Sequence, residues 1–177
     1  MRYVLRWGVL CLLVAGTSLH VEFSAAEEGG ATPPAANSEL KTDTAPPPPP
    51  IFERVATAEK GTLKNPYTDN PEASEEGRKI YFGASCNGCH GGTGGGGMCP
   101  PLSNEVWVYG SDDDTLFRLV TLGTVELQKR GYTRKGRENV VSIMPSMGPI
   151  LKTEEKLWKV IAWIRSVYRG DPARRNW

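Results

Sequence analysis

The feature that most constrains this chain is the pentapeptide CNGCH at positions 86–90, in which a histidine directly follows the second of two cysteines. This C-x-x-C-H spacing is typical of covalent haem attachment. Each thiol can bond one vinyl group of the porphyrin, and the next residue directs its imidazole onto the iron. We therefore predict one haem c, bound through Cys86 and Cys89, with His90 as an axial ligand of its iron.

Two other chemistries use the same residue types. A thioredoxin-like redox pair needs a βαβ setting, whereas this motif follows a predicted helix and enters a glycine-rich loop at 91–97. A zinc site could combine the motif with Cys99, but the adjacent Cys89 and His90 could hardly both reach one tetrahedral ion. The motif therefore favours haem over both alternatives.

The first 26 residues are typical of a cleavable secretory signal. Arg2 and Arg6 precede a short apolar run at 9–14, and small residues follow at 24–26. The apolar run is too short to span a bilayer, although flanking residues could extend it into an uncleaved anchor. We expect a periplasmic protein, held at a membrane only if this segment is retained.

Cleavage after residue 26 would leave a nearly neutral chain, because 21 basic and 20 acidic residues would become 19 and 19. This balance argues against nucleic acid, whose binders carry a concentrated basic excess. His90 would be the only histidine left, so a second histidine could not complete the iron coordination. Cys99 would be an odd cysteine, either buried beside the haem as a small hydrophobe or exposed and able to join two chains.

Composition divides the chain into four parts. We predict the signal over 1–26, a Pro-rich disordered tether and an extended arm over 27–65, one haem domain over 66–170 and a basic C-terminal tail over 171–177. The arm is expected because the apolar residues of 51–67 show no sustained period.

We expect helices over about 71–83, 112–123 and 154–170. Asn70 is a typical N-cap for the first helix. Acidic residues at 112–114 suit the positive end of the second helix, and Gly123 suits its end. Thr153 caps the third, whose apolar residues recur at steps of three and four. No alternating pattern predicts strands, so the fold should be mostly α with long irregular loops.

Three methionines compete for the remaining iron position, because methionine sulfur is the ordinary partner of histidine in electron-transfer haems. Met98 lies close after His90 in a glycine-rich run and fits a contact on the proximal side. Met144 and Met147 lie in IMPSMGPI, far enough along the chain to reach the opposite haem face. At this point both remain open.

These motifs resemble the Class I cytochrome c family over about residues 66–170. In that family a glycine and an aromatic residue precede the haem motif, as Gly77 and Tyr81 do here. The resemblance implies that the last helix crosses the first. It also implies that the carbonyl of Pro100 accepts a hydrogen bond from the ring of His90, which would orient the ring and raise its basicity.

The family's Met-Pro-x-aromatic-Gly strap implies that Met144 is the iron ligand and that Met147 occupies the aromatic position. The sequence departs from the family at Cys99, where a glycine usually precedes the proline.

A more specific resemblance is to the c-type cytochromes of methanol metabolism, the relatives of cytochrome c(L). Four stretches carry it: NPYTDNPEASEEGRKIYFGASCNGCHGG, PPLSNEVWVYG, VTLGTVELQKRGYTRKGRENVV and LWKVIAWIRSVYRGDPARRNW. The resemblance implies an electron carrier without substrate chemistry of its own. Its donor would be a pyrroloquinoline quinone (PQQ)-dependent methanol or alcohol dehydrogenase, and its acceptor a downstream cytochrome c or terminal oxidase.

Two other functions remain open at this point. The cytochrome could serve a different dehydrogenase or reductase, or it could be a haem sensor or peroxidase-like protein with an exchangeable axial ligand.

A basic stretch precedes the strap and comprises Lys129, Arg130, Arg134, Lys135 and Arg137. It could lie near the haem edge, where it would neutralise the haem propionates or steer an acidic partner. The alternative is a solvated loop without such a role.

Overall fold

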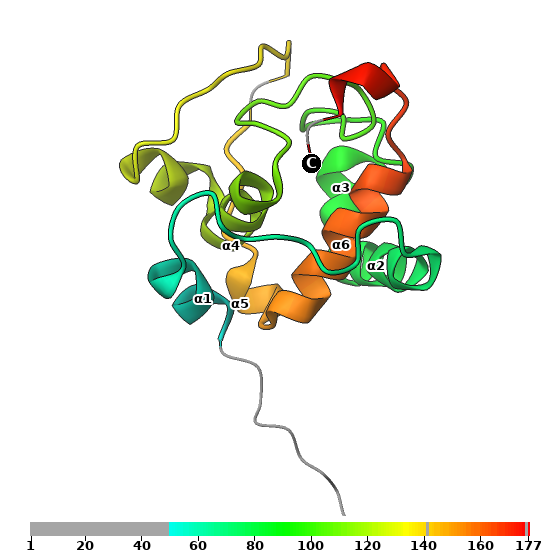
Figure 1. Cartoon of the computed structure of the whole chain (residues 1–177). Helices are drawn as coiled ribbons and strands as arrows, with labels where there is room; N and C mark the ends of the chain where they lie inside the picture. Colours follow the sequence, from blue (N-terminus) through cyan, green and yellow to red (C-terminus); the bar gives the residue numbers. More distant parts are fainter. Residues whose placement is uncertain (1–49, 141, 176) are drawn as a thin grey trace, which may run out of the picture. The chain divides into compact units, whose positions relative to one another are not determined.

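The computed structural model describes residues 50–140, 142–175 and 177. The predicted signal and nearly all of the Pro-rich tether lie outside these residues. The described elements are α1 (Ile51–Thr57), α2 (Pro71–Gly83), α3 (Cys86–His90), α4 (Asp113–Lys129), α5 (Gly148–Leu151), α6 (Glu154–Ser166) and a 3-10 helix (Pro172–Arg174) (Figure 1). Within the described ranges there is no strand, only an isolated bridge between Pro50 and Thr153. The prediction of a mostly α fold is confirmed.

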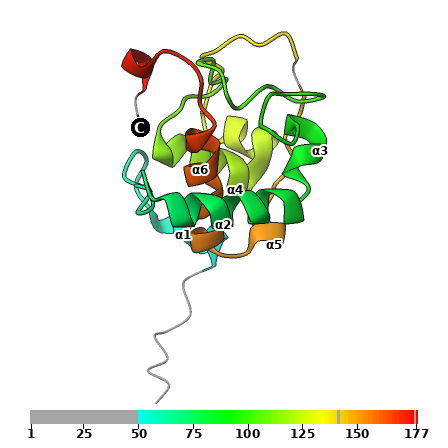
Figure 2. The same ribbon diagram turned by 90° about the vertical axis from the view of Figure 1, so that its right-hand side faces the viewer.

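The crossing of α2 and α6 forms the centre of this fold (Figure 2). α2 begins as predicted, because the side chain of Asn70 accepts a hydrogen bond from the backbone of Ala73 at 2.9 Å. At the crossing, a Cβ on Gly77 would lie 1.9 Å from the carbonyl oxygen of Lys159. Only a glycine therefore lets the two backbones approach this closely.

The extended arm predicted over 51–67 is wrong at its start, because α1 forms there. Ile51 and Val55 lie one turn apart, and both are buried in the core. A helix of seven residues offers only two such apolar positions, too few for the 3.6-residue period to show in the sequence. Leu63 is also a core residue, so the core extends back beyond residue 66.

α4 is longer than predicted. Its cap is Asp112, the first of the acidic residues expected at its start, but Gly123 does not end it. Gly123 has φ +76° and ψ 169°, which interrupts the helical path, and the helix then continues to Lys129. The predicted stop is instead a kink. α6 begins after the Thr153 cap, as predicted, but ends at Ser166 rather than near residue 170.

The acidic residues at the start of α4 have a second role besides that of helix-start acids. Asp113 and Asp114 are only 4% and 2% exposed. Asp113 pairs with Arg165 of α6, and Asp114 pairs with Arg118 at 2.8 Å. Burial alone would raise the pKa of Asp114, but the hydrogen bonds from Arg118 and from backbone N–H groups lower it below its usual value.

The same network fastens α1 and the segment after it to α4. Arg118 donates to the backbone carbonyls of Val55, Ala58 and Glu59, at distances between 2.9 and 3.1 Å. Buried guanidinium groups need such a full set of acceptors, because an unpaired buried charge is very costly. Among the residues that the structure describes, no helix is both long and apolar enough to cross a membrane.

Candidate haem-binding site

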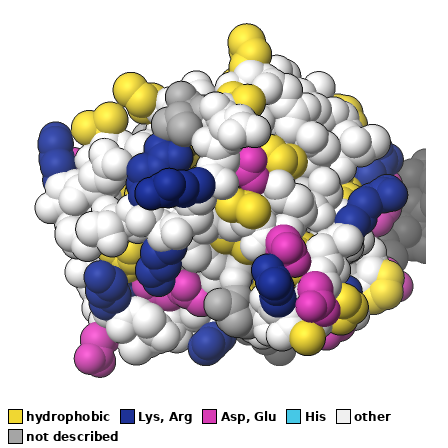
Figure 3. Space-filling view, turned by 90° about the horizontal axis from the view of Figure 1, so that it is seen from above, with side chains coloured by type: hydrophobic (Ala, Val, Ile, Leu, Met, Phe, Trp, Pro, Cys, Tyr) yellow, Lys and Arg dark blue, Asp and Glu magenta, His cyan; other side chains and the backbone are white. Residues whose placement is uncertain are grey.

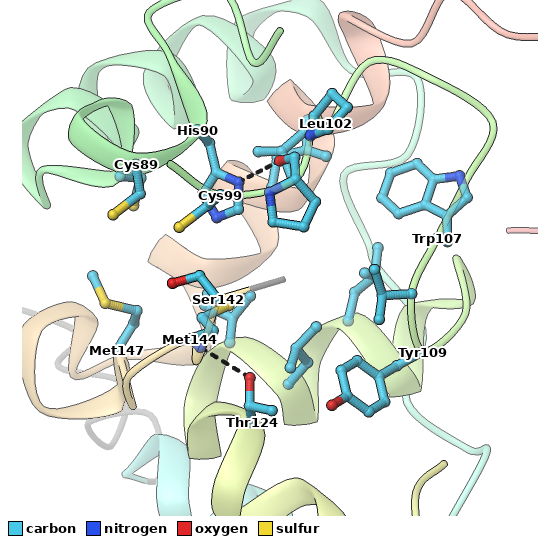
Figure 4. A pocket seen from close by; sticks show the side chains of 18 of the residues that line it. Cys89, His90, Cys99, Leu102, Trp107, Tyr109, Thr124, Ser142, Met144 and Met147 are labelled. Atoms are coloured by element: carbon cyan, nitrogen blue, oxygen red, sulfur yellow. Dashed lines mark hydrogen bonds between the residues drawn. The ribbon is translucent and has the colours of Figure 1, made fainter. Parts of the chain in front are cut away.

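A cavity of about 320 Å³ lies between the end of α2, α3, the loop at 99–110, α4 and the strap that precedes α5. Most of its lining side chains are apolar. The predicted haem residues all line it: Cys86, Cys89, His90, Pro100, Met144 and Met147. Figure 4 shows His90 entering from one side and both methionines from the opposite side.

The ring of His90 is oriented by the backbone of the following loop. Its Nδ1 lies 2.8 Å from the carbonyl oxygen of Pro100 (Figure 4). A carbonyl can only accept, so Nδ1 carries the proton, and Nε2 is left with its lone pair for a metal. Burial lowers the pKa of His90, and the bond to Pro100 opposes this. At neutral pH the lowered pKa favours the uncharged imidazole, which is the form that binds iron.

The loop after His90 is folded back onto α3. The N–H of Gly96 donates to the carbonyl of His90 at 2.9 Å, and the N–H of Cys99 donates to the carbonyl of Cys89 at 3.2 Å. The hydroxyl of Tyr81 donates to the carbonyl of Gly91 at 2.7 Å. These bonds bring Pro100 under the histidine ring.

Met98 lies on this loop but does not line the cavity, and it is 70% exposed. The described cavity therefore does not bring Met98 to the position of an iron ligand or of a proximal contact.

The three cysteines at the cavity are not joined in a disulfide. Burial raises the pKa of the Cys86 thiol and of the Cys99 thiol. Cys99 is 7% exposed, in agreement with the buried alternative. Among the described residues, no three His, Cys, Asp or Glu side chains are placed to bind one metal ion, which is the arrangement that a zinc site requires.

The methionine strap is held against the kink of α4. Met144 and Thr124 are joined by two hydrogen bonds. The N–H of Met144 donates to Thr124 Oγ1 at 3.0 Å, and the N–H of Thr124 donates to the carbonyl of Met144 at 2.9 Å. A Cβ on Gly123 would lie 2.6 Å from the backbone nitrogen of Ser146. Met147 is buried in the core, whereas Met144 is half-buried and packs against the core.

Sequence reasoning missed the role of Thr124 and gave Gly123 the wrong one. The available signal was a glycine followed by threonine within an otherwise helical pattern, VTLGTVELQK. A glycine inside such a pattern often has a packing reason rather than a stop function. The aromatic residues Trp107 and Tyr109 also line the cavity without having been predicted.

The structure divides the predicted basic docking patch. All five side chains are exposed, but only Arg134 lines the cavity. Lys129 and Arg130 lie at the end of α4 and pair with Glu126 at 3.6 and 3.3 Å. The backbone N–H of Lys135 donates to the carbonyl of Val108, which fastens this loop to the opposite wall of the cavity. Figure 3 shows Lys and Arg side chains spread over one face, among acidic and hydrophobic side chains.

The residues at the cavity fit haem c. The attachment chemistry needs two thiols one helical turn apart, and the iron needs an imidazole with a free Nε2. Both are present at one end of an apolar cavity, and methionine sulfur is available across it. The apolar lining suits the porphyrin ring.

A family model and a curated relative match this chain. The family model described as "Cytochrome C oxidase, cbb3-type, subunit III" matches residues 72–164, just over half of the chain. Cytochrome c-L of Methylorubrum extorquens (strain AM1) is 27% identical over 166 residues, which cover 93% of this chain and 64% of that protein. This chain therefore spans less than two thirds of the length of that relative.

Two solved structures are similar to the chain. The first is cytochrome CL from the marine methylotrophic bacterium Methylophaga aminisulfidivorans MPT, at 24% identity and a TM-score of 0.49, covering 70% of this chain and 71% of that one. The second is cytochrome cL from Hyphomicrobium denitrificans, at 26% identity and a TM-score of 0.49, covering 76% and 66%.

The family match extends from the first turn of α2 to the last turns of α6, and it includes the CNGCH motif and the methionine strap. The chain therefore belongs to the cytochrome c family that this model describes: it is a c-type cytochrome, an electron-transport protein that carries haem c.

Proposed function

We propose that this protein is a periplasmic single-haem electron carrier, which accepts electrons from a PQQ-dependent methanol or alcohol dehydrogenase. It would pass them to a downstream cytochrome c or terminal oxidase. The observation that carries the proposal is that one cavity receives His90 from one side and a methionine strap from the other. A chain that fills both axial positions leaves none for a substrate, which favours a carrier over a sensor or peroxidase.

Each residue has a proposed task at the haem. Cys86 and Cys89 would form the two thioether bonds, and Nε2 of His90 would bind the iron. Pro100 holds the histidine ring through its 2.8 Å hydrogen bond, which also raises the basicity of Nε2. When bound, the haem supplies one-electron redox chemistry at its iron.

Met144 is the proposed second axial ligand, with Met147 as the alternative. Two observations favour Met144. Its backbone is fixed on both sides by Thr124, whereas the side chain of Met147 is 8% exposed and forms part of the hydrophobic core. A core residue would have to give up its packing to reach the iron.

The proposed docking surface surrounds the cavity. Ile143 is 69% exposed although it directly precedes Met144, and Met98 and Phe82 are exposed beside cavity residues. Exposed apolar side chains gathered around one site are typical of a protein interface. Arg134 adds a positive charge at the same cavity, which suits an acidic partner.

The choice of donor rests on the resemblance to cytochromes of methanol metabolism and on the similarity to cytochrome c-L. The decisive experiment mixes the oxidised holoprotein with a PQQ-dependent methanol dehydrogenase and follows haem reduction after methanol is added. We expect rapid reduction that depends on both enzyme and methanol. Reduction only by a different dehydrogenase would support the alternative carrier and exclude this donor.

A matched pair of variants tests the docking surface. Arg134→Gln should slow reduction by the dehydrogenase and weaken its dependence on salt, because one steering charge is lost. Arg54→Gln removes the same charge from α1, where Arg54 pairs with Glu154, and should leave the rate unchanged. Equal rates of haem reduction in the two variants would show that Arg134 does not belong to the docking surface.

A further inference from the structure

The contact between Thr124 and Met144 closes a ring of two hydrogen bonds between residues that are far apart in sequence. Each residue donates one bond and accepts one, at 3.0 Å to Thr124 Oγ1 and at 2.9 Å to the carbonyl of Met144. Thr124 is 8% exposed, so water cannot replace its hydroxyl without rearrangement. Both the position and the direction of the Met144 backbone are thereby fixed.

The kink at Gly123 makes this contact possible. In an unbroken helix the N–H of Thr124 would donate to the carbonyl of Val120. Here it donates to Met144 instead, and the carbonyl of Val120 accepts from the N–H of Met147 at 2.9 Å. The strap thus provides hydrogen-bond partners for the N–H of Thr124 and the carbonyl of Val120, which the kink leaves without their helical partners. It could not lie so close to α4 if Gly123 carried a Cβ.

The side-chain bond is the part of this contact that depends on the residue type. Any residue except proline offers a backbone N–H at 124, but the bond from the Met144 N–H needs a side-chain acceptor such as the hydroxyl in this position. Threonine is also stiff about its first side-chain torsion because it is branched at Cβ, so its oxygen is held in place. A valine would have the same shape but would leave the N–H of Met144 without its partner.

We propose that Thr124 is the positioning residue for the axial methionine: its hydroxyl holds the Met144 backbone so that the sulfur stays on the iron. This inference rests on the proposed role of Met144 and adds a determinant of how firmly that ligand is bound. Loss of one buried hydrogen bond should shift the equilibrium towards the methionine-free form about five- to tenfold.

The test uses the full holoprotein in four forms: wild type, Thr124→Val, Thr124→Ser and Ser146→Ala. The Ser146 hydroxyl donates to the carbonyl of Thr121 at 2.6 Å, so Ser146→Ala removes a bond between the same strap and the same helix, but away from Met144. The readouts are the weak red absorption band of methionine sulfur on ferric iron, the reduction potential and the rate of cyanide binding.

We expect Thr124→Val to bind cyanide about five- to tenfold faster, with a weaker red band and a lower reduction potential. Thr124→Ser should restore all three readouts, and Ser146→Ala should keep them at wild-type values. An unchanged Thr124→Val protein would overturn the inference. Equal changes in Thr124→Val and Ser146→Ala would also overturn it, since the effect would then be a general loosening of the strap.

Two further variants separate this inference from the ligand assignment. If Met144→Leu abolishes the red band and Thr124→Val leaves it unchanged, only the role of Thr124 is wrong. If Met147→Leu abolishes the band instead, the assignment of Met144 is wrong and the role of Thr124 falls with it.

Discussion

Gly77 of α2 meets the backbone of Lys159 in α6 so closely that a Cβ would lie 1.9 Å from the Lys159 carbonyl oxygen. We expect Gly77→Ala to lower the free energy of unfolding of the holoprotein by about 3 kcal/mol, because the backbones of both helices must move apart. Urea denaturation measures this loss. Gly83→Ala is the control, since it lies on the same helix with open space around it, and it should be neutral or slightly stabilising.

The buried pair of Asp114 and Arg118 gives a second prediction. Asp114→Asn should lower the free energy of unfolding by about 3–5 kcal/mol, because it leaves the guanidinium buried without its counter-charge. The exposed pair of Glu75 and Arg78, joined at 2.9 Å, is the comparison. Glu75→Gln should leave the free energy of unfolding nearly unchanged, because the exposed pair is screened by water. Similar losses of unfolding free energy in Asp114→Asn and Glu75→Gln would show that burial does not decide how much each ion pair contributes.

The lowered pKa of Asp114 predicts how stability depends on pH. In the folded protein the pKa of Asp114 lies below its value in the unfolded chain, about 3.9. Between these two pKa values the folded state therefore binds fewer protons than the unfolded state. The stabilisation is complete above about pH 5 and is lost as the pH falls through the folded pKa. The difference in unfolding free energy between wild type and Asp114→Asn should therefore narrow below about pH 4. A difference that widens on acidification would contradict the lowered pKa.

The kink in α4 predicts a strong effect of a single methyl group. Gly123 and Gly131 both have positive φ, at +76° and +81°, so alanine is strained at either position. Only at Gly123 would the Cβ also meet the strap, at 2.6 Å from the backbone of Ser146. We expect Gly123→Ala to weaken the red absorption band and to destabilise the holoprotein by about 3 kcal/mol or more. Gly131→Ala should keep the band and lose only about 1 kcal/mol.

Removal of the haem gives the last prediction. The cavity of about 320 Å³ has a mostly apolar lining, which the haem would cover and which its removal would leave in contact with water. A small domain has a stability of only about 5–15 kcal/mol, so the loss of this apolar contact is a large fraction of it. We therefore expect the double variant Cys86→Ser, Cys89→Ser, prepared without haem, to show little helix by circular dichroism. A native helix content with a sharp thermal transition would contradict this.

Local signals in the sequence were enough to predict the start of a helix where that helix has a strong N-cap. Asn70, Asp112 and Thr153 all accept a hydrogen bond from the first turn of the helix that they begin. The CNGCH motif likewise predicted a site that the cavity brings together, because its spacing is set by covalent chemistry rather than by tertiary packing.

The remaining features depend on contacts between distant segments. α1 is too short to show a period, and it is held by Arg118, far along the chain. A glycine at the position of Gly123 is typical of a helix end. The helix continues past it because the strap from Met144 onwards hydrogen-bonds to the backbone groups at the kink, and this contact cannot be seen in the sequence. Asp113 is a typical helix-start acid in sequence, and its buried partner Arg165 lies on a different helix.

The two hydrogen bonds between Thr124 and Met144 form a clamp, which separates the methionine strap from the surface loop before it. Each of these two parts could change during evolution without the other. The clamp fixes both ends of the segment 125–143, which contains the whole basic stretch. Substitutions within that segment, or changes in its length, would alter the surface offered to a partner while the clamp keeps the methionine in register. Related chains could thereby acquire new partners while the axial ligand of the iron, and with it the reduction potential, stays the same.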